Sequence, residues 1–209
     1  MSLADEDPGP AGPSVGGPHG RRPPAWLADA ERLDLAVHRA IASTSTPVLD
    51  ASLSRLSRAA DHSKLSLLAA GVLAVGGGPT GRRAAVSGLA SLAVTATTVN
   101  VVLKLLVRRR RPDPDRVPAS RQVPMPSSRS FPSGHSAAAF AFATGVGEVS
   151  PGAAIPLRAL AVVVAYSRVH TGVHYPGDVI AGALAGVTLA EVTSRALLLR
   201  QRRRGSSSP

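Results

Sequence analysis

Apolar residues gather in five long segments in the middle and at the end of this 209-residue chain. The segments cover, in order, residues 65–77, 84–107, 136–149, 153–167 and 178–199. A transmembrane helix needs about 20 mainly apolar residues, so the second and fifth segments are long enough alone and the others need their flanks. The pattern predicts an all-α fold, an integral membrane bundle of about five to six transmembrane helices. A soluble helical bundle is the alternative, which the uninterrupted length of the second segment disfavours.

Small residues recur within these segments, as in AGALAGVTLA at residues 181–190. Lipid chains are as apolar as the side chains, so helices in a membrane associate mainly through close packing, which small residues allow. We therefore expect tight contacts between the helices.

The regions outside the apolar segments divide the chain. Residues 1–24 are rich in Pro and Gly and are predicted to form a disordered tail. Residues 25–63 have apolar positions at helical spacing broken by polar ones, which indicates an amphipathic or interfacial helical segment, either a hairpin at the membrane surface or a poor first span. Residues 64–200 are predicted to be the membrane domain, and 201–209 a basic flexible tail.

The amino-acid composition is compatible with several classes of binding partner. The formal net charge is +11, and 24 residues are Lys or Arg. Such a charge suits nucleic acid, an anionic membrane surface or a phosphate-bearing substrate. The chain has no cysteine, which excludes disulfides and thiolate metal sites.

If the five spans alternate in direction, the loop 108–132 and the turn 168–177 lie on the same face of the membrane. Basic residues near the spans are almost balanced between the two faces, so the positive-inside rule does not decide the orientation. If some arginines of the first face serve chemistry, that face is the outer one.

The first group of candidate residues on that face is KLLVRRRRP, residues 104–112. Lys104 and Arg111 project from the same side of a helix if the helix continues to Pro112, which then ends it. A lysine in mid-membrane costs about 2.5 to 3.5 kcal/mol, so Lys104 should reach the interface or meet an anion. An ordinary basic membrane anchor is the alternative.

The second group is SFPSGHS, residues 130–136, at the start of an apolar segment. Ser130 and Pro132 are signals for a helix start, where free backbone N–H groups attract anions. Gly134 has no side chain to block close approach. The alternative is a capped helix with an interfacial histidine at position 135.

The third group is SRVHTGVHYPGD, residues 167–178. Pro176 predicts a helix start and puts Asp178 in the first turn, close enough to bond one imidazole nitrogen of His174 and leave the other as nucleophile or base. His170 has no such partner in the sequence. Because the three groups hold more arginines than carboxylates, a divalent metal site is disfavoured.

These motifs resemble the three-part signature of the type 2 phosphatidic acid phosphatase superfamily, which comprises membrane lipid phosphatases and shares an active-site plan with bacterial acid phosphatases and vanadium haloperoxidases. The parts KLLVRRRRP, PSGH (132–135) and SRVHTGVHYPGD occur in order, with nineteen residues between Pro112 and Pro132. The resemblance covers about residues 64–200. Members commonly have six spans, whereas the first is degraded or interfacial here.

The resemblance implies a role for each residue. His174 would attack phosphorus to form a phosphohistidine, oriented by Asp178, and His135 would protonate the leaving alkoxide and then activate water. The phosphoryl oxygens would be held by Lys104, Arg111, Ser133, Gly134 and Arg168, with Arg110 as an alternative one position away. No metal and no cofactor is expected.

The predicted function is therefore hydrolysis of a lipid phosphate or diphosphate monoester, of the phosphatidic acid, phosphatidylglycerol phosphate or polyprenyl phosphate type. We expect a multi-pass protein of the cell membrane whose interfacial active site lies on the extracytoplasmic face. No nucleic acid partner is expected. Two alternatives are a vanadate-dependent peroxidase on the same fold and a non-catalytic basic membrane protein that binds anionic lipid or nucleic acid. The latter leaves His135 and His174 unexplained.

Overall fold

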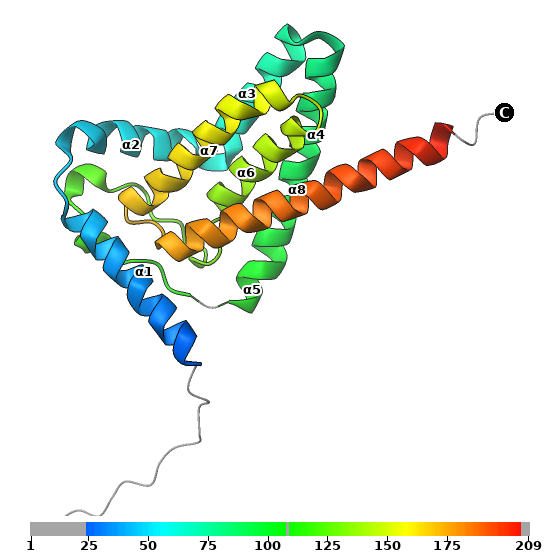
Figure 1. Ribbon diagram of the computed structural model, residues 1–209. Coiled ribbons are helices and arrows are strands. Elements are labelled where there is room, and N and C mark those ends of the chain that lie inside the picture. The colour runs from blue at the N-terminus through cyan, green and yellow to red at the C-terminus, as the bar shows by residue number, and fades with distance from the viewer. Residues whose placement is uncertain (1–23, 108, 206–209) are drawn as a thin grey trace, which may run out of the picture.

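The computed structural model describes residues 24–107 and 109–205, and within these ranges the chain is helical without β-strands (Figure 1). The α-helices are α1 (Ala25–Ser43), α2 (Pro47–Ala59), α3 (Lys64–Gly76), α4 (Gly78–Thr97), α5 (Lys104–Leu106), α6 (Gly134–Gly147), α7 (Pro151–His170) and α8 (Pro176–Gly205). Short 3-10 turns form η1 (Asp61–Ser63), η3 (Pro114–Arg116) and η4 (Ala119–Arg121), and a π-helical stretch, η2 (Thr98–Leu103), joins α4 to α5. The tail expected at residues 1–24 lies, apart from Pro24, outside the described residues.

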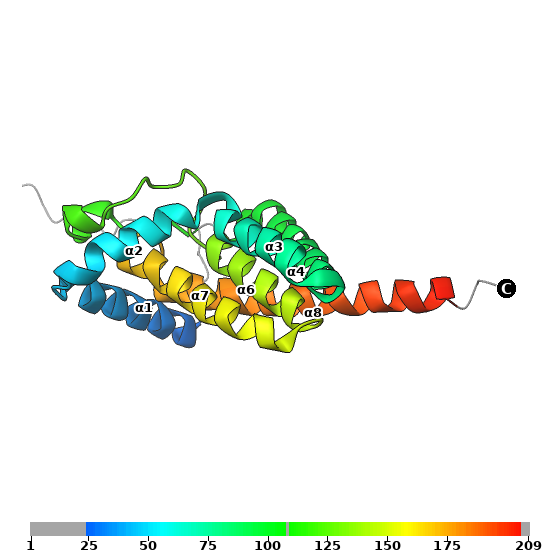
Figure 2. The same cartoon turned by 90° about the horizontal axis from the view of Figure 1, so that it is seen from above.

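Helix α6 is the centre of the bundle and packs against α4, α7 and α8 (Figures 1 and 2). Its side chains are small, and Ala137, Ala141 and Ala143 are fully buried. Phe142 is the large exception, and it packs with Ala84, Ala85 and Val146 in the core. A helix surrounded on three sides in this way positions whatever stands at its first turn.

The close approach of α8 to α6 depends on two glycines, as the small residues of 181–190 predict. A Cβ on Gly182 would lie 2.4 Å from the carbonyl oxygen of Ser133, and one on Gly186 would lie 2.3 Å from that of Ala137. Any side chain at these positions would force the helices apart. Tight packing here fixes the start of α8 against the start of α6.

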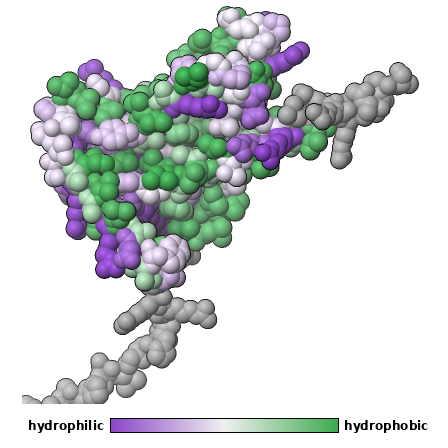
Figure 3. Space-filling view, in the orientation of Figure 1, coloured by the Kyte–Doolittle hydropathy of each residue, from purple (hydrophilic) through white to green (hydrophobic). Residues whose placement is uncertain are grey.

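Within the described residues, three helices are long and apolar enough to cross a membrane: Gly78–Leu106, Pro151–His170 and Pro176–Leu197. They correspond to three of the five predicted segments. The other two segments form α3 and α6, whose 13 and 14 residues are fewer than the roughly 20 that a span requires. The described part of the chain is therefore helical, with three candidate membrane spans, and the count of five to six stays a prediction. Apolar side chains cover much of the surface in Figure 3.

The segment 25–63 folds as two helices, α1 and α2, followed by η1. Helix α1 packs on α7 and α8, and α2 packs on α7 and η4. Neither α1 nor α2 is among the candidate spans. Both helices lie beside the end of the bundle where α7 ends and α8 begins (Figures 1 and 2).

At the other end of the chain, α8 continues to Gly205, so its helix passes the boundary expected at residue 200. The expected flexible tail, 201–209, is therefore helical over its first five residues, and residues 206–209 lie outside the described part.

Candidate active site

The segment between α5 and α6, residues 109–133 and termed here the strap, places the arginine run differently from the prediction. The helix ends at Leu106, because Val107 is extended, with φ −113° and ψ 113°. The expectation that the helix continues to Pro112 is therefore wrong. The strap instead carries Arg111 toward the turn between α7 and α8.

Lys104 and Arg111 nevertheless meet, on a serine of the strap. Lys104 Nζ donates to Ser128 Oγ over 3.1 Å, and Arg111 donates from Nε to the Ser128 carbonyl over 2.9 Å and from Nη2 to Ser128 Oγ over 3.2 Å. Two cations of the first motif thus converge, although a helix does not hold them together.

His174 and Asp178 form the expected pair. His174 Nδ1 lies 3.4 Å from Asp178 Oδ2, and the two side chains are 1% and 0% exposed. Arg111 Nη1 lies 3.0 Å from His174 Nε2 and also donates to the Val173 carbonyl. An arginine can only donate, so Nε2 carries the lone pair and the ring proton is on Nδ1, facing Asp178. This is the tautomer that a nucleophilic Nε2 requires.

Further donors converge on the carboxylate of Asp178. Ser130 Oγ donates to it, as do the backbone N–H of Tyr175 over 3.0 Å and Arg109 Nη1 over 2.9 Å. Arg109 also bonds Asp34 of α1 and lies 4.3 Å from the centre of the Tyr175 ring. These donors fix the carboxylate that orients His174.

His135 and Arg168 share a carboxylate that the sequence motifs do not include. His135 Nε2 lies 2.9 Å from Asp61 Oδ1, and Arg168 Nη1 lies 3.5 Å from the same oxygen. Arg168 is 1% exposed, and it donates to the carbonyl and hydroxyl of Ser57 over 3.0 and 2.7 Å. Both residues therefore reach toward η1 and the end of α2.

The start of α6 lies beside these groups. Its cap is Ser133, one residue after the predicted Pro132, and the Ser133 hydroxyl accepts from the Ser136 amide over 3.4 Å. The Ser133 amide donates to the Asp178 carbonyl over 2.9 Å. A Cβ on Gly134 would lie 3.7 Å from Lys104 Nζ, so this glycine faces the lysine.

Burial and neighbouring cations keep both histidines of the site neutral. Burial lowers the pKa of His174 to about 4, and the Arg111 charge adds to this effect against the opposing influence of Asp178. Burial, followed by the charge of Arg168, lowers the pKa of His135 to about 4, while Asp61 opposes the change. At neutral pH, His174 Nε2 therefore keeps its lone pair.

His170 lies in a separate buried cluster. Its side chain is 1% exposed, and it has an acidic partner that the sequence around it does not show. Its Nε2 lies 3.1 Å from Asp50 Oδ1, which also accepts from Arg121 Nε over 2.8 Å. Arg121 further bonds the backbone at the end of α1. This cluster ties α2, α7 and the strap together.

Sequence reasoning missed four residues that contact the predicted site: Asp61, Arg109, Ser128 and Ser130. One feature of the sequence could have pointed to Asp61: it is an isolated carboxylate, and the next acidic residue along the chain is Asp113. Nothing in the arginine run distinguishes Arg109 from its neighbours. Arg110, the alternative to Arg111, is exposed in the structure. In the described part of the chain, no group of three or more His, Cys, Asp or Glu side chains is placed to hold a metal ion.

Comparisons with known proteins show the family of this chain. The profile of the PAP2 superfamily matches residues 84–202. A decaprenylphosphoryl-5-phosphoribose phosphatase of Mycolicibacterium smegmatis is 37% identical over 166 residues, covering 75% of this chain and 84% of that protein. The Mycobacterium tuberculosis protein of the same name is 37% identical over 113 residues, which cover 54% of this chain and 61% of the relative's length.

Two solved structures have similar folds. LpxE of Aquifex aeolicus superposes with a TM-score of 0.62 at 25% identity, covering 78% of this chain and 95% of that one. The PAP2-type phosphatidylglycerolphosphate phosphatase of Bacillus subtilis gives 0.59 at 27% identity, covering 79% and 84%. With the profile matching more than half of its length, the chain belongs to the PAP2 superfamily.

Proposed function

We propose that this protein is a membrane phosphatase that hydrolyses a lipid phosphate or diphosphate monoester through a phosphohistidine at His174. The observation that carries the proposal is the environment of that imidazole: it is buried, its Nδ1 faces Asp178, and its Nε2 faces the guanidinium of Arg111. A nucleophile held in this tautomer beside a cation suits attack on an anionic phosphoryl group.

In the first step, His174 Nε2 bonds to phosphorus and the bond between phosphorus and the lipid oxygen breaks. His135 gives its proton to that oxygen, so an alcohol leaves instead of an alkoxide. The positive charge that develops on the His174 ring is balanced by Asp178, which accepts from Nδ1.

In the second step, water attacks the phosphohistidine. His135 takes a proton from the water, the P–N bond breaks, and the electron pair of that bond returns to His174 Nε2. The proton passes from His135 to the departing inorganic phosphate, so His135 is neutral again when the site is empty.

Three cations would balance the charge on the phosphoryl oxygens: Lys104, Arg111 and Arg168. Arg168 keeps a buried donor for this purpose, because its Nε is buried and makes no hydrogen bond to any described residue. Positioned cations supply most of the stabilisation in phosphoryl transfer. Ser133 and Gly134, at the start of α6, would line the same anion site.

The membrane arrangement follows from the place of the site. The strap and the turn before α8 lie together at one end of the bundle, at the ends of candidate spans. We infer a multi-pass protein whose site meets the head groups at the extracytoplasmic surface. The names of the mycobacterial relatives favour a polyprenyl-linked sugar phosphate over a simple phospholipid.

The proposal is tested by phosphate release from the detergent-solubilised full chain, measured with and without EDTA. Because arginine and lysine take the electrophilic role, we expect turnover of a polyprenyl phosphate or diphosphate to change by less than about twofold on chelation. Loss of activity in EDTA that returns when a divalent cation is added would contradict the mechanism.

The pH dependence of kcat/KM gives a second test. A phosphate monoester loses its second proton near pH 6, at about the value for phosphoamino acids. With both histidines neutral in the empty site, the proton for the leaving oxygen arrives on the monoanionic substrate and passes to His135. We expect kcat/KM to fall below pH about 4, as His174 is protonated, and to fall again above about pH 6. An acid limb near the ordinary histidine value would contradict the geometry of His174.

A further inference from the structure

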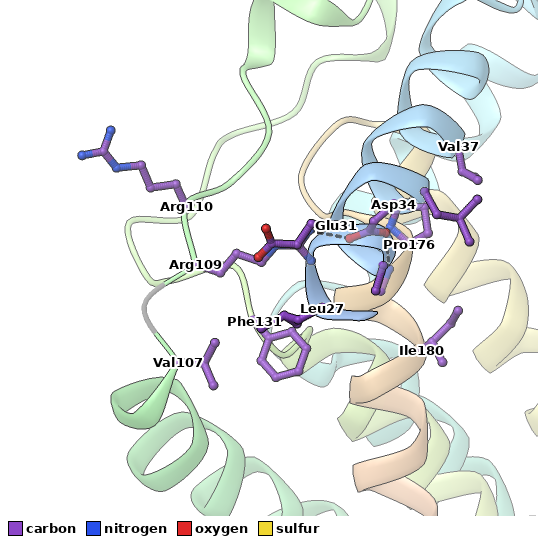
Figure 4. A pocket seen from close by; sticks show the side chains of 13 residues that line it. Leu27, Glu31, Asp34, Val37, Val107, Arg109, Arg110, Phe131, Pro176 and Ile180 are labelled. Atoms are coloured by element: carbon purple, nitrogen blue, oxygen red, sulfur yellow. Dashed lines mark hydrogen bonds and ion pairs between the residues drawn. The ribbon is translucent and has the colours of Figure 1, made fainter. Parts of the chain in front are cut away.

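An apolar cavity of about 900 Å³ adjoins the site beneath α1 (Figure 4). Leu27, Leu33 and Val37 of α1 line one side, and Phe131 of the strap and Ile180 of α8 line the other. This volume is near the upper end of the range of about 300–1,000 Å³ for ligand pockets. Leu33 and Ile180 remain 66% and 60% exposed, so the cavity opens toward the surroundings of the bundle. A hydrocarbon chain fits such an opening.

A second, smaller cavity of about 330 Å³ lies along the strap. Its lining is basic and hydroxylated: Arg109, Arg110, Arg111, Pro126, Ser127, Ser128 and Arg129. Among these residues, Arg111 and Ser128 also contact the predicted phosphoryl site, through His174 and Lys104. The smaller cavity therefore borders the place where the phosphate is cleaved.

The two cavities share Arg109 and Arg110. Arg111 links the basic cavity to His174, and the two shared arginines link the basic cavity to the apolar cavity, so the order along these residues is nucleophile, basic cavity, apolar cavity. A substrate whose hydrocarbon chain joined directly to the cleaved phosphate would leave the basic cavity without a partner. The order instead matches an amphiphile with a polar anionic unit between its chain and its terminal phosphate.

Arg110 is the residue of the basic cavity that is free to bind such a unit. Arg109 is occupied by Asp34 and Asp178, and Arg129 donates to the carbonyls of Lys104 and Leu105. Arg110 makes no hydrogen bond or ion pair with any described residue, and Figure 4 shows it extending away from α1. Of the acids near the cavities, Asp34 is neutralised by Arg109, and Glu31 of α1 lines the apolar cavity, where Figure 4 shows it beside Arg109.

We propose that Arg110 and the basic cavity bind a second anionic group of the substrate, so that the preferred substrate class carries a further phosphate between the hydrocarbon chain and the cleaved phosphate. This inference rests on the proposed function. A lipid diphosphate and a lipid-linked sugar phosphate both meet the requirement, since each has two phosphate groups in line. A guanidinium pairs with phosphate oxygens through two parallel hydrogen bonds, which gives the second group a defined place.

The test compares Arg110→Gln with the wild type on four substrates: a polyprenyl monophosphate, a polyprenyl diphosphate, a polyprenyl-phosphoryl sugar phosphate and p-nitrophenyl phosphate. We expect kcat/KM to fall about tenfold on one or both of the substrates with two phosphates. The other two should change by less than about twofold, and p-nitrophenyl phosphate also reports whether the variant is folded. The matched control is Arg116→Gln, an exposed arginine of the strap that lines neither cavity.

The four substrates separate the outcomes. A loss confined to the diphosphate or to the sugar phosphate identifies which of the two sources the cavity recognises. An equal loss on all four substrates, no loss on any, or the same pattern from Arg116→Gln would overturn the inference while leaving the phosphatase intact. If the wild type hydrolyses none of them, the proposed function itself fails.

Discussion

Replacing His174 with alanine is expected to lower kcat/KM by roughly 10⁴-fold or more. The change removes the atom that bonds to phosphorus, and no neighbouring side chain supplies another lone pair in the same place, since Arg111 and Arg168 only donate. Phosphate release from a lipid phosphate, measured per folded protein, gives the loss. Residual turnover near the wild-type rate would rule out His174 as nucleophile.

His170→Ala is the matched control, because this histidine stands four residues earlier and is equally buried. Its ring bonds Asp50, in a cluster that contains none of the predicted catalytic side chains. Leaving the buried carboxylate with one partner fewer costs about 1–3 kcal/mol. We therefore expect a lower Tm and nearly unchanged kcat. A loss of kcat as large as that of His174→Ala would contradict the separation of the two clusters.

The covalent step has its own signature. A rapidly quenched reaction with labelled substrate should leave phosphate on the wild-type chain that is labile in acid and stable in base, and none on His174→Ala. Wild-type turnover without any trapped phosphate would indicate direct attack by water.

The pair formed by His174 and Asp178 was predictable because its information is local. Pro176 begins α8, Asp178 stands in its first turn, and four residues separate the pair, so backbone geometry alone brings them within reach. The candidate spans and the small residues between α6 and α8 were predictable for a similar reason, since both depend on patterns within one segment.

The arginine run was predicted less well, because a helix boundary depends on contacts that the run does not contain. The helix ends at Leu106 and the strap begins, and Arg111 finds its partners on Ser128 and the turn at Val173. Lys104 and Arg111 therefore come together because the strap brings Arg111 to Ser128, which Lys104 also contacts, and not because the two residues share one helix face.

The carboxylates contributed by the N-terminal helices could not be predicted from the sequence. Asp34, Asp50 and Asp61 all lie in residues 25–63, which were expected to form an amphipathic or interfacial segment or a poor first span, and each bonds a residue at least 70 positions later. Such pairings depend on how α1 and α2 dock on α7 and α8, which no local pattern specifies. They show that the N-terminal helices complete the surroundings of the site.

His135→Ala is expected to lower kcat/KM for a lipid substrate by about 10²- to 10⁴-fold, the range that general acid–base catalysis supplies. The loss should be much smaller for the formation of phosphoenzyme from p-nitrophenyl phosphate, because its leaving group departs without a proton. Water attack still needs the base, so this variant should release about one equivalent of nitrophenolate in a burst and then turn over slowly. A loss that is equal for both substrates, without a burst, would contradict the role of His135.

Asp61→Asn extends this test to the carboxylate that faces His135. Removing the negative charge weakens the hold of His135 on the proton that it receives from the substrate, so we expect kcat/KM to fall about 10-fold, while the alkaline limb near pH 6 stays in place because the substrate sets it. If Asp61 acts through His135, the double variant should be no slower than His135→Ala alone, because the residue through which Asp61 works is already gone. Multiplying losses would instead assign its effect to Arg168, the other partner of the same oxygen. In either case the carboxylate of η1 takes part in setting the charge at the phosphoryl site, although it lies outside all three sequence motifs.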